Sequence, residues 1–459
     1  MRTIAFAIPL LAVALATPAA AQVAGADGRT PADGPPLRLR NWMAEAPRQS
    51  VTMAQDASSP AAVSTLASLV SEALQKNPEL RAAAKETEAA SQRVSPAGAL
   101  EDPMLEAGVL NVPSQSWRLN SEDMTMKMLG LSQKLPFPGK RALREQVAAK
   151  DAETLNYGLR ETTNRVVRDV KLAYFDLALI DQTVRLLQGN RLVLEQFLRI
   201  AEGRYAVGQA AQADVLKAQT QLGRMREELL RMERERPVIE AELVRLLGRR
   251  GNAAPIAVEA PGMRDTAFKL ESLQETALRE RPQLLGLQSA IDRNGKALEL
   301  ARKESDPDFE LRFVYGQRDK NQMGAAREDL VSLTVAMNLP VWRKSKTEPR
   351  IAEAQALREQ TQEMQQAQQN EVLARLRQQL AITEQSRKSV RLYETDILPQ
   401  ARLAVEATLA AYRVSRADLL MLLDSQMTLF GYEISGARER ANFNKALAEI
   451  ELLTGRQLF

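Results

Sequence analysis

A heptad repeat of apolar residues runs from Val166 to Ala201. In alternating steps of four and three it passes through eleven positions, of which ten are apolar and only Arg191 is charged. This spacing predicts a helix that supercoils against other helices, because it keeps one apolar stripe turned toward a partner. No Pro occurs between Lys140 and Ala201, so we expect one helix over that range, on the order of 90 Å long. A helix of this length belongs to an extended structure.

The composition restricts the chemistry that the chain can perform. Its 459 residues include no Cys and no His, which excludes disulfides, thiolate nucleophiles, His-based triads and metal sites built from these side chains. We therefore expect no enzyme, no cofactor and no resident metal. The charge is nearly balanced, with 62 basic and 58 acidic side chains, and the absence of a dense basic block argues against a nucleic-acid partner.

The first residues have the order of a secretory signal. Arg2 precedes the apolar run Ile4–Ala16, and small residues follow it. We interpret residues 1–21 as a signal peptide. Residues 22–60 are rich in Pro, Ala and Gly without periodicity, which predicts a disordered N-terminal extension. No later apolar run is long enough for a membrane-spanning helix, so contact with lipid would require strands.

The remainder of the chain is an internal duplication. Three pairs of segments match at one shift of 204 residues: Ala73–Leu80 with Ala277–Leu284, Asp102-Pro103 with Asp306-Pro307, and Leu135-Pro136 with Leu339-Pro340. Further along, the shift becomes 207 residues, and Tyr205 matches Tyr412. We therefore expect a first repeat at 61–250, a linker at 251–269 and a second repeat at 270–459.

Each repeat is expected to contain a helix, a strand pair and a long α-hairpin, in that order. The expected helices are Leu66–Arg93, Lys140–Ala201 and Ala213–Leu246 in the first repeat, and Leu270–Lys303, Lys346–Ala410 and Leu419–Leu452 in the second. Within the second set, the Gln-rich segment Thr361–Asn370 has few apolar positions. We predict that this segment is exposed to water on most sides.

The strand pairs alternate between apolar and polar residues. The expected pairs are Met104–Val112 with Met124–Leu135, and Phe309–Tyr315 with Leu330–Val341. Alternation alone favours a half-buried soluble sheet, but the signal peptide and the duplicated long helices favour a membrane β-barrel. Four strands cannot close a barrel around a pore, so several chains must contribute. The predicted fold class is mainly α with a small β part, in which long coiled-coil α-hairpins join transmembrane strands.

The polar faces of these strands supply candidate pore-lining residues. They are Glu106, Glu310, Arg312, Met124, Met126 and Met128. The Met residues are ambiguous, because their hydrophobicity favours lipid whereas the repeat places them on the lumen side. A ring of thioethers could contact soft cations such as Cu(I), but we expect lipid contact or simple lining.

The motif LSQKLPFPGKR at Leu131–Arg141 resembles the strand-to-helix corner of TolC-family outer-membrane efflux proteins, closest to the CzcC-like and CusC-like branch that serves heavy-metal resistance. The turns Tyr205–Gly208 and Tyr412–Ser415 resemble the periplasmic tips of that family. The resemblance covers Leu66 to the C-terminus. It implies a homotrimer in the outer membrane of a Gram-negative bacterium, with a twelve-stranded barrel above a helical periplasmic tunnel. It also implies two partners, a periplasmic adaptor (membrane fusion) protein and an inner-membrane transporter of the resistance-nodulation-division type.

The resemblance also implies roles for residues near the tips. Asp214 and Tyr412 match an inter-helix lock at the closed end, and Arg416 lies one position from the basic partner of that lock. Asp424 matches an acidic position at the tunnel constriction, and Asp418 lies near another. In a trimer each Asp would form a ring of three charges that favours cations, although Asp418 could equally be a helix N-cap.

The tips themselves are the expected docking site for the adaptor. The residues concerned are Tyr205, Gly208, Val414 and Ser415. Gly208 is expected to adopt a left-handed conformation in the turn. Ser415 replaces it in the second repeat, so we expect that turn to have a different shape.

These observations favour a passive exit duct from periplasm to outside, with heavy-metal cations as substrate. One alternative is the same kind of duct for drugs or for type I protein secretion. Another is a soluble periplasmic coiled-coil adaptor, which would show one hairpin instead of two copies of a strand pair and a hairpin.

Overall fold

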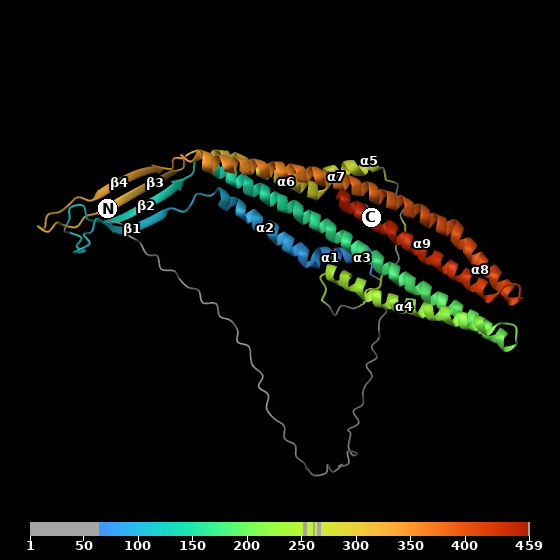
Figure 1. The fold of residues 1–459 in the computed structure, drawn as a ribbon. Coiled ribbons are helices and arrows are strands. Elements are labelled where there is room, and N and C mark those ends of the chain that lie inside the picture. Colours follow the sequence, from blue (N-terminus) through green and yellow to red (C-terminus); the bar gives the residue numbers. More distant parts are fainter. Residues whose placement is uncertain (1–63, 121, 251–254, 260–261, 264–267, 458–459) are drawn as a thin grey trace, which may run out of the picture. The chain divides into compact units, whose positions relative to one another are not determined.

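The computed structural model describes residues 64–120, 122–250, 255–259, 262–263 and 268–457 (Figure 1). The chain divides into two units, Met1–Ala57 and Ser58–Phe459, and the described residues belong to the second. The predicted signal peptide, the predicted N-terminal extension and part of the predicted linker lie outside the described residues.

The first helix of each repeat is broken in two. These helices are α1 (Leu66–Lys76), α2 (Pro78–Gly98), α5 (Leu270–Glu280) and α6 (Pro282–Lys303). The prediction of one continuous helix was wrong because a residue before Pro is driven out of the helical conformation. Asn77 is accordingly extended, with φ −61° and ψ 123°. Its side chain accepts the N–H groups of Glu79 and Leu80 at 2.8 and 3.2 Å, which makes it the N-cap of α2.

Four antiparallel strands form one sheet in the order β1-β2-β3-β4. Their bounds are β1 Met104–Leu110, β2 Met126–Leu135, β3 Phe309–Gln317 and β4 Leu330–Met337. The central pairing, β2 with β3, joins the two repeats and sets Leu131 opposite Phe313. Within the described residues, β1 and β4 are each paired on one side only.

The two faces of the sheet differ in polarity, as the alternation predicts. One face is mostly apolar, and most of its side chains are exposed in the single chain. These exposed residues are Leu105, Val109, Leu129, Leu131, Leu311, Phe313, Tyr315, Val331, Leu333, Val335 and Met337. The opposite face carries the candidate pore-lining charges.

The long helices are α3 (Lys140–Ala206), α4 (Gln212–Leu246), α7 (Glu348–Leu392), α8 (Leu398–Arg413) and α9 (Leu419–Thr454). The single long helix predicted from Lys140 is confirmed. Its counterpart in the second repeat instead begins with a π-helical turn at Arg343–Thr347 and is interrupted by another at Tyr393–Ile397. Pro399 follows the second turn closely, and a Pro removes one helical hydrogen bond and disturbs the preceding turn. None of the helices in the described part of the chain is both long and apolar enough to cross a membrane.

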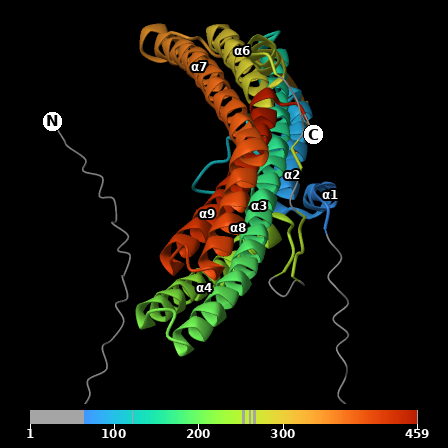
Figure 2. The ribbon, with the colours of Figure 1, turned by 90° about the vertical axis from the view of Figure 1, so that its right-hand side faces the viewer.

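The heptad of α3 forms the core of the helical layer. Val166, Leu177, Leu187 and Leu194 are each at most 1% exposed. Helix α3 packs against α4 and α9, and α9 packs against α8, so the four helices lie side by side (Figure 2). No residue of the Gln-rich segment Thr361–Asn370 is buried, which confirms its predicted exposure.

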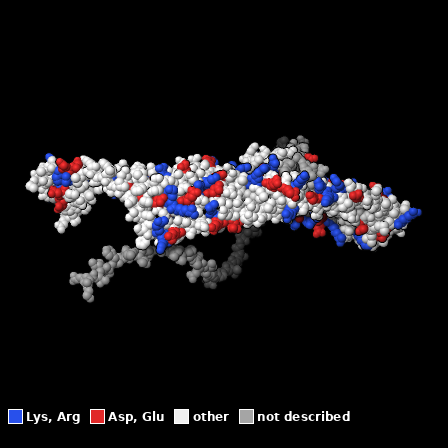
Figure 3. Space-filling view, turned by 90° about the horizontal axis from the view of Figure 1, so that it is seen from above, with Lys and Arg blue, Asp and Glu red and all other residues white. Residues whose placement is uncertain are grey.

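Charged side chains of both signs are interspersed along the helices (Figure 3). The surface over the strands is mostly uncharged in the same view, except for a small charged group at the end farthest from the helices. Near this end of the sheet, Lys127 of β2 pairs with Asp319, with 3.1 Å between Nζ and Oδ1.

Candidate functional site

Both α-hairpins turn through the same backbone conformation. Gly208 has φ 73° and Ser415 has φ 62°, so both are left-handed. Their N–H groups donate to the carbonyls of Tyr205 and Tyr412 at 3.0 and 3.1 Å. A second bond closes each turn, from the residue after the left-handed one to a carbonyl five residues earlier, as in a Schellman motif. The expectation that Ser415 changes the shape of the second turn was therefore wrong.

The tips expose the residues expected to dock an adaptor. Tyr205 is 48% exposed and Val414 is 63% exposed. Gly208 and Ser415 are also exposed. The neighbouring Val207, which was not singled out in the sequence, is 68% exposed. The two tips thus present matching apolar side chains to solvent in the single chain.

Arg204, in the last turn of α3, connects the first tip to the second. Its Nη1 donates to the carbonyl of Tyr412, and its Nη2 donates to Oγ of Ser415 at 2.7 Å. Its guanidinium carbon lies 4.6 Å from the centre of the Tyr412 ring, within the range of a cation–π contact. We call Arg204, Tyr412 and Ser415 the tip cluster. Sequence reasoning missed Arg204, although a cation in the last helical turn was an available signal.

Tyr412 is only 2% exposed, and its hydroxyl is buried without a hydrogen-bond partner among the described residues. Burial is the main cause that raises the pKa of Tyr412, and the charge of Asp214 adds to it, whereas the Arg204 guanidinium acts in the opposite direction. Asp214 therefore influences Tyr412 by its charge. The structure shows no hydrogen bond between these two residues.

The remaining acidic candidates lie on α9. Asp418 is the N-cap, and its carboxylate accepts the N–H of Met421 at 2.8 Å. Asp418, Asp424 and Arg416 are all exposed in the single chain. The capping role of Asp418 is therefore a feature of the structure, and it leaves the second carboxylate oxygen free to face solvent.

The polar face of the sheet brings three of the predicted charges together. Arg312 lies between two carboxylates, with Nη2 3.4 Å from Glu106 and 3.3 Å from Glu310. Met126 and Met128 share this face, as the repeat predicted. Met126 is 8% exposed and packs against Gly316, where an added Cβ would lie 2.5 Å from its sulfur. Unlike these two, Met124 precedes β2 and is 54% exposed.

The strand-to-helix corner is held by an ion pair whose Lys side chain is buried. Lys140 Nζ lies 2.8 Å from a carboxylate oxygen of Asp308 and 2.8 Å from the carbonyl of Asp306. The side chain of Lys140 is 3% exposed, and that of Asp308 is 38% exposed. The same Asp308 oxygen accepts the N–H of Phe137 at 2.8 Å. A residue of the first repeat thus fixes the start of β3 in the second.

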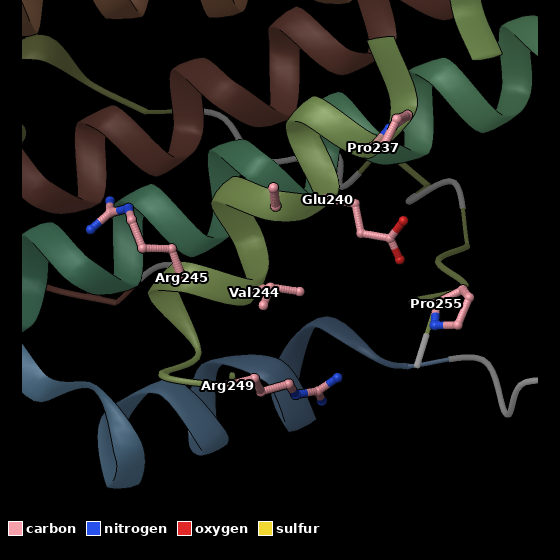
Figure 4. A pocket seen from close by; sticks show the side chains of 7 residues that line it. Pro237, Glu240, Val244, Arg245, Arg249 and Pro255 are labelled. Atoms are coloured by element: carbon pink, nitrogen blue, oxygen red, sulfur yellow. The ribbon is translucent and has the colours of Figure 1, made fainter. Parts of the chain in front are cut away.

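A cavity of about 440 Å³ lies beside the last turns of α4 (Figure 4). Its charged groups already have partners. Glu240 accepts from Arg236 at 2.7 Å and from the N–H of Ile256, and Arg249 forms two hydrogen bonds with Glu72 at 3.0 and 2.6 Å. These contacts tie α4 to α1 and to the segment around Ile256, so we assign them a structural role.

The sheet with one exposed apolar face, joined to paired α-hairpins, fits the expectation of an outer-membrane channel protein. Residues 69–249 match the family model described as outer membrane efflux protein. The chain is 23% identical over 399 residues to the cobalt-zinc-cadmium resistance protein CzcC of Cupriavidus metallidurans, and the alignment covers 85% of this chain and 90% of the relative.

Solved structures show the same fold. The outer membrane protein VceC of Vibrio cholerae is 18% identical, with a TM-score of 0.73 over 85% of this chain and 96% of that one. A CusC structure is 14% identical, with a TM-score of 0.72 over 86% and 93%. The family match over residues 69–249, the CzcC relative and the CusC structure support the predicted resemblance to TolC-family outer-membrane efflux proteins of the heavy-metal branch. The protein is accordingly a transport channel of the Gram-negative outer membrane with a large periplasmic helical part, and not an enzyme. These findings favour an outer-membrane channel over the soluble adaptor.

Proposed function

We propose that the protein is the exit duct of a tripartite efflux system and that three copies assemble around one water-filled bore. The observation that carries this proposal is that the sheet and the helical layer of the single chain both end in unpaired edges. Each edge needs a partner, and a second copy of the same chain offers one.

The sheet supplies the first part of the argument. Within the described residues β1 and β4 each lack a partner on one side, while the apolar face of the sheet is exposed. Unpaired backbone groups are not tolerated in lipid, so a strand edge must be closed by another strand. Three chains would supply twelve strands, enough for a closed barrel that surrounds a channel.

The helices supply the second part. Because α3 and α9 lie in the middle of the layer, α4 and α8 form its edges. Leu216 and Leu230 on α4 are 54% and 66% exposed, and Leu403 on α8 is 64% exposed. Leu216 and Leu230 are two heptads apart, the spacing of a coiled-coil seam. This supports packing of α4 of one copy against α8 of the next.

The assembly is tested by its mass and by its strand contacts. Protein solubilised in detergent is expected to have three times the mass of the mature chain, which is the 50.9 kDa of the full chain less the predicted signal peptide, measured by light scattering with the detergent subtracted. The chain has no native Cys, so single cysteines placed on β1 and β4 can report contact between copies by cross-linking. A monomer that does not enter lipid vesicles would overturn the proposal.

We propose heavy-metal cations as the substrate. Support comes from the name of the relative CzcC, a cobalt-zinc-cadmium resistance protein, and from the exposed carboxylates of Asp418 and Asp424. Asp418→Asn separates two roles, because Asn keeps the helix cap and removes the charge. We expect this variant to reduce cation selectivity in lipid bilayers, with Asp424→Asn giving a similar loss. A deletion strain should become sensitive to metal cations, and sensitivity to drugs alone would contradict the metal assignment.

We further propose that the tips dock a periplasmic adaptor protein, which links the duct to an inner-membrane transporter of the resistance-nodulation-division type. The exposure of Tyr205, Gly208, Val414 and Ser415 supports this assignment. Val207→Glu and Val414→Glu should abolish co-purification with the adaptor without changing the mass of the assembly. Leu192→Glu, at an exposed position well away from the tips, is the matched control.

A further inference from the structure

The last turns of α3 and α8 meet at the tip cluster. The C-terminal end of a helix carries partial negative charge and carbonyl groups without helical partners. Two such ends therefore repel each other unless a cation lies between them. Arg204 occupies that place, because it donates to the carbonyl of Tyr412 in α8 and, at 3.4 Å, to the carbonyl of Gln209 beyond α3.

The same side chain holds the second tip in two further ways. It donates to Oγ of Ser415 at 2.7 Å, in the residue with left-handed backbone. Its guanidinium also faces the ring of Tyr412, with 4.6 Å between the guanidinium carbon and the ring centre. A guanidinium can make these contacts together because its donors lie in a planar fork and its faces stack on aromatic rings.

Comparison of the two repeats shows that only the first tip has an Arg at this position. The position equivalent to Arg204 in the second tip is Ala411, so each chain has a single Arg at this place. The Tyr412 hydroxyl contributes no hydrogen bond among the described residues, and Asp214 acts on it only by charge. Among the described residues, the hydrogen bonds between the two tips thus come from Arg204, beside the apolar cluster in which Tyr412 packs with Ala201 and Ala218.

We propose that Arg204 is a positioning residue that holds the two tips of one chain together and thereby keeps the periplasmic end of the duct narrow. This inference rests on the proposed function as a duct. Opening would require Arg204 to leave the Tyr412 carbonyl, the Tyr412 ring and the Ser415 hydroxyl. Arg204 would thus stabilise the closed state, although it is not one of the lock residues that the family resemblance implies.

The test is single-channel recording of the full-length protein in planar lipid bilayers. Loss of a charge-assisted hydrogen bond corresponds to about tenfold or more in an equilibrium, so Arg204→Ala should raise the ratio of open to closed time by that factor. Arg204→Lys should give a ratio of open to closed time between those of the wild type and Arg204→Ala, because Lys keeps the charge and loses the planar arrangement of several donors. Arg199→Ala removes an exposed Arg five residues earlier on the same helix and should match the wild type.

Two further variants distinguish this inference from the lock implied by the resemblance. Tyr412→Phe keeps the ring and the carbonyl that Arg204 contacts, and should gate as the wild type does. Asp214→Asn should also leave gating unchanged. The inference would be overturned if these two variants raised the ratio of open to closed time while Arg204→Ala kept the wild-type ratio. If Arg204→Ala fails to assemble, Arg204→Gln and Arg204→Lys replace it, and wild-type gating in both would be equally decisive.

The recordings also separate failure of the inference from failure of the proposed function. If the wild type and Arg204→Ala conduct equally, the duct stands and the role of Arg204 is wrong. If neither forms a conducting pore, the duct itself is wrong and the inference falls with it. Circular dichroism of each variant confirms that the helices are retained.

Discussion

Replacing Lys140 with Met tests the ion pair that joins the two repeats at the strand-to-helix corner. Met keeps most of the aliphatic length and removes the ammonium group. The lost contacts are those to the Asp308 carboxylate and the Asp306 carbonyl, each at 2.8 Å. Breaking a fully buried pair costs about 3–5 kcal/mol. Asp308 is 38% exposed and keeps the N–H of Phe137, so we expect about 2 kcal/mol, close to one hydrogen bond to a charged group.

The assay is thermal unfolding of the purified protein in detergent, followed by circular dichroism. For a chain of this size we expect a fall of about 2–4 °C in Tm. Lys344→Met is the matched control, because Lys344 is the repeat equivalent of Lys140 and is exposed. It removes the same charge, and its Tm should stay at the wild-type value.

The result that would refute this reasoning is an equal Tm for the two variants. A second measurement uses the double variant Lys140→Met with Asp308→Asn. If the cost of the single variant comes from an unpaired carboxylate, removing that charge should recover part of the lost stability. No recovery would show that the cost has another origin, such as altered packing at the corner.

Three further predictions concern the hairpins and the contact between Glu72 and Arg249. Gly208→Ala should destabilise the first tip by about 1 kcal/mol, because Gly208 has a φ of 73° and an Ala strains the backbone there. The space around Gly208 is open, so no steric clash adds to this strain. Faster amide hydrogen exchange at the tip would show the destabilisation. Leu194→Ala should cost about 2–5 kcal/mol because Leu194 is 1% exposed, whereas Leu192→Ala, at 54% exposure, should be nearly neutral in thermal unfolding. The hydrogen bond from Arg249 lowers the pKa of Glu72 from its usual 4.5. The pKa of Glu72 is therefore lower in the folded state than in the unfolded state. The contact with Arg249 thus stabilises the fold above pH 4.5, and this stabilisation is lost as the pH falls through the folded pKa. Glu72→Gln should flatten that part of the pH dependence of Tm.

Several elements could be predicted from the sequence because their signals are local and periodic. The heptad identified α3, the absence of Pro after Lys140 gave its correct start, and the period-two alternation identified both faces of the sheet. The break at Asn77 was missed although its signal, the following Pro78, was visible, because the apolar period continues across it. The π-helical turn at Tyr393–Ile397 was also missed, since helical periodicity does not distinguish a wide turn from a regular one.

The candidate site divides in the same way. The residues of the tips were recognisable from a duplicated motif, but the partner of the second tip was not. Arg204 is far from Tyr412 in the chain, and its counterpart in the repeat is Ala411. No comparison of the two repeats could therefore reveal the contact.

By itself, the sequence determined the duplication, the long helices and the two-faced strands, because each depends on residue spacing along the chain. Only the tertiary structure decided that Lys140 pairs with Asp308 and that Arg204 reaches the second tip. Those choices depend on which distant segments become neighbours, and the energies of side-chain contacts between such segments have no periodic trace in the chain.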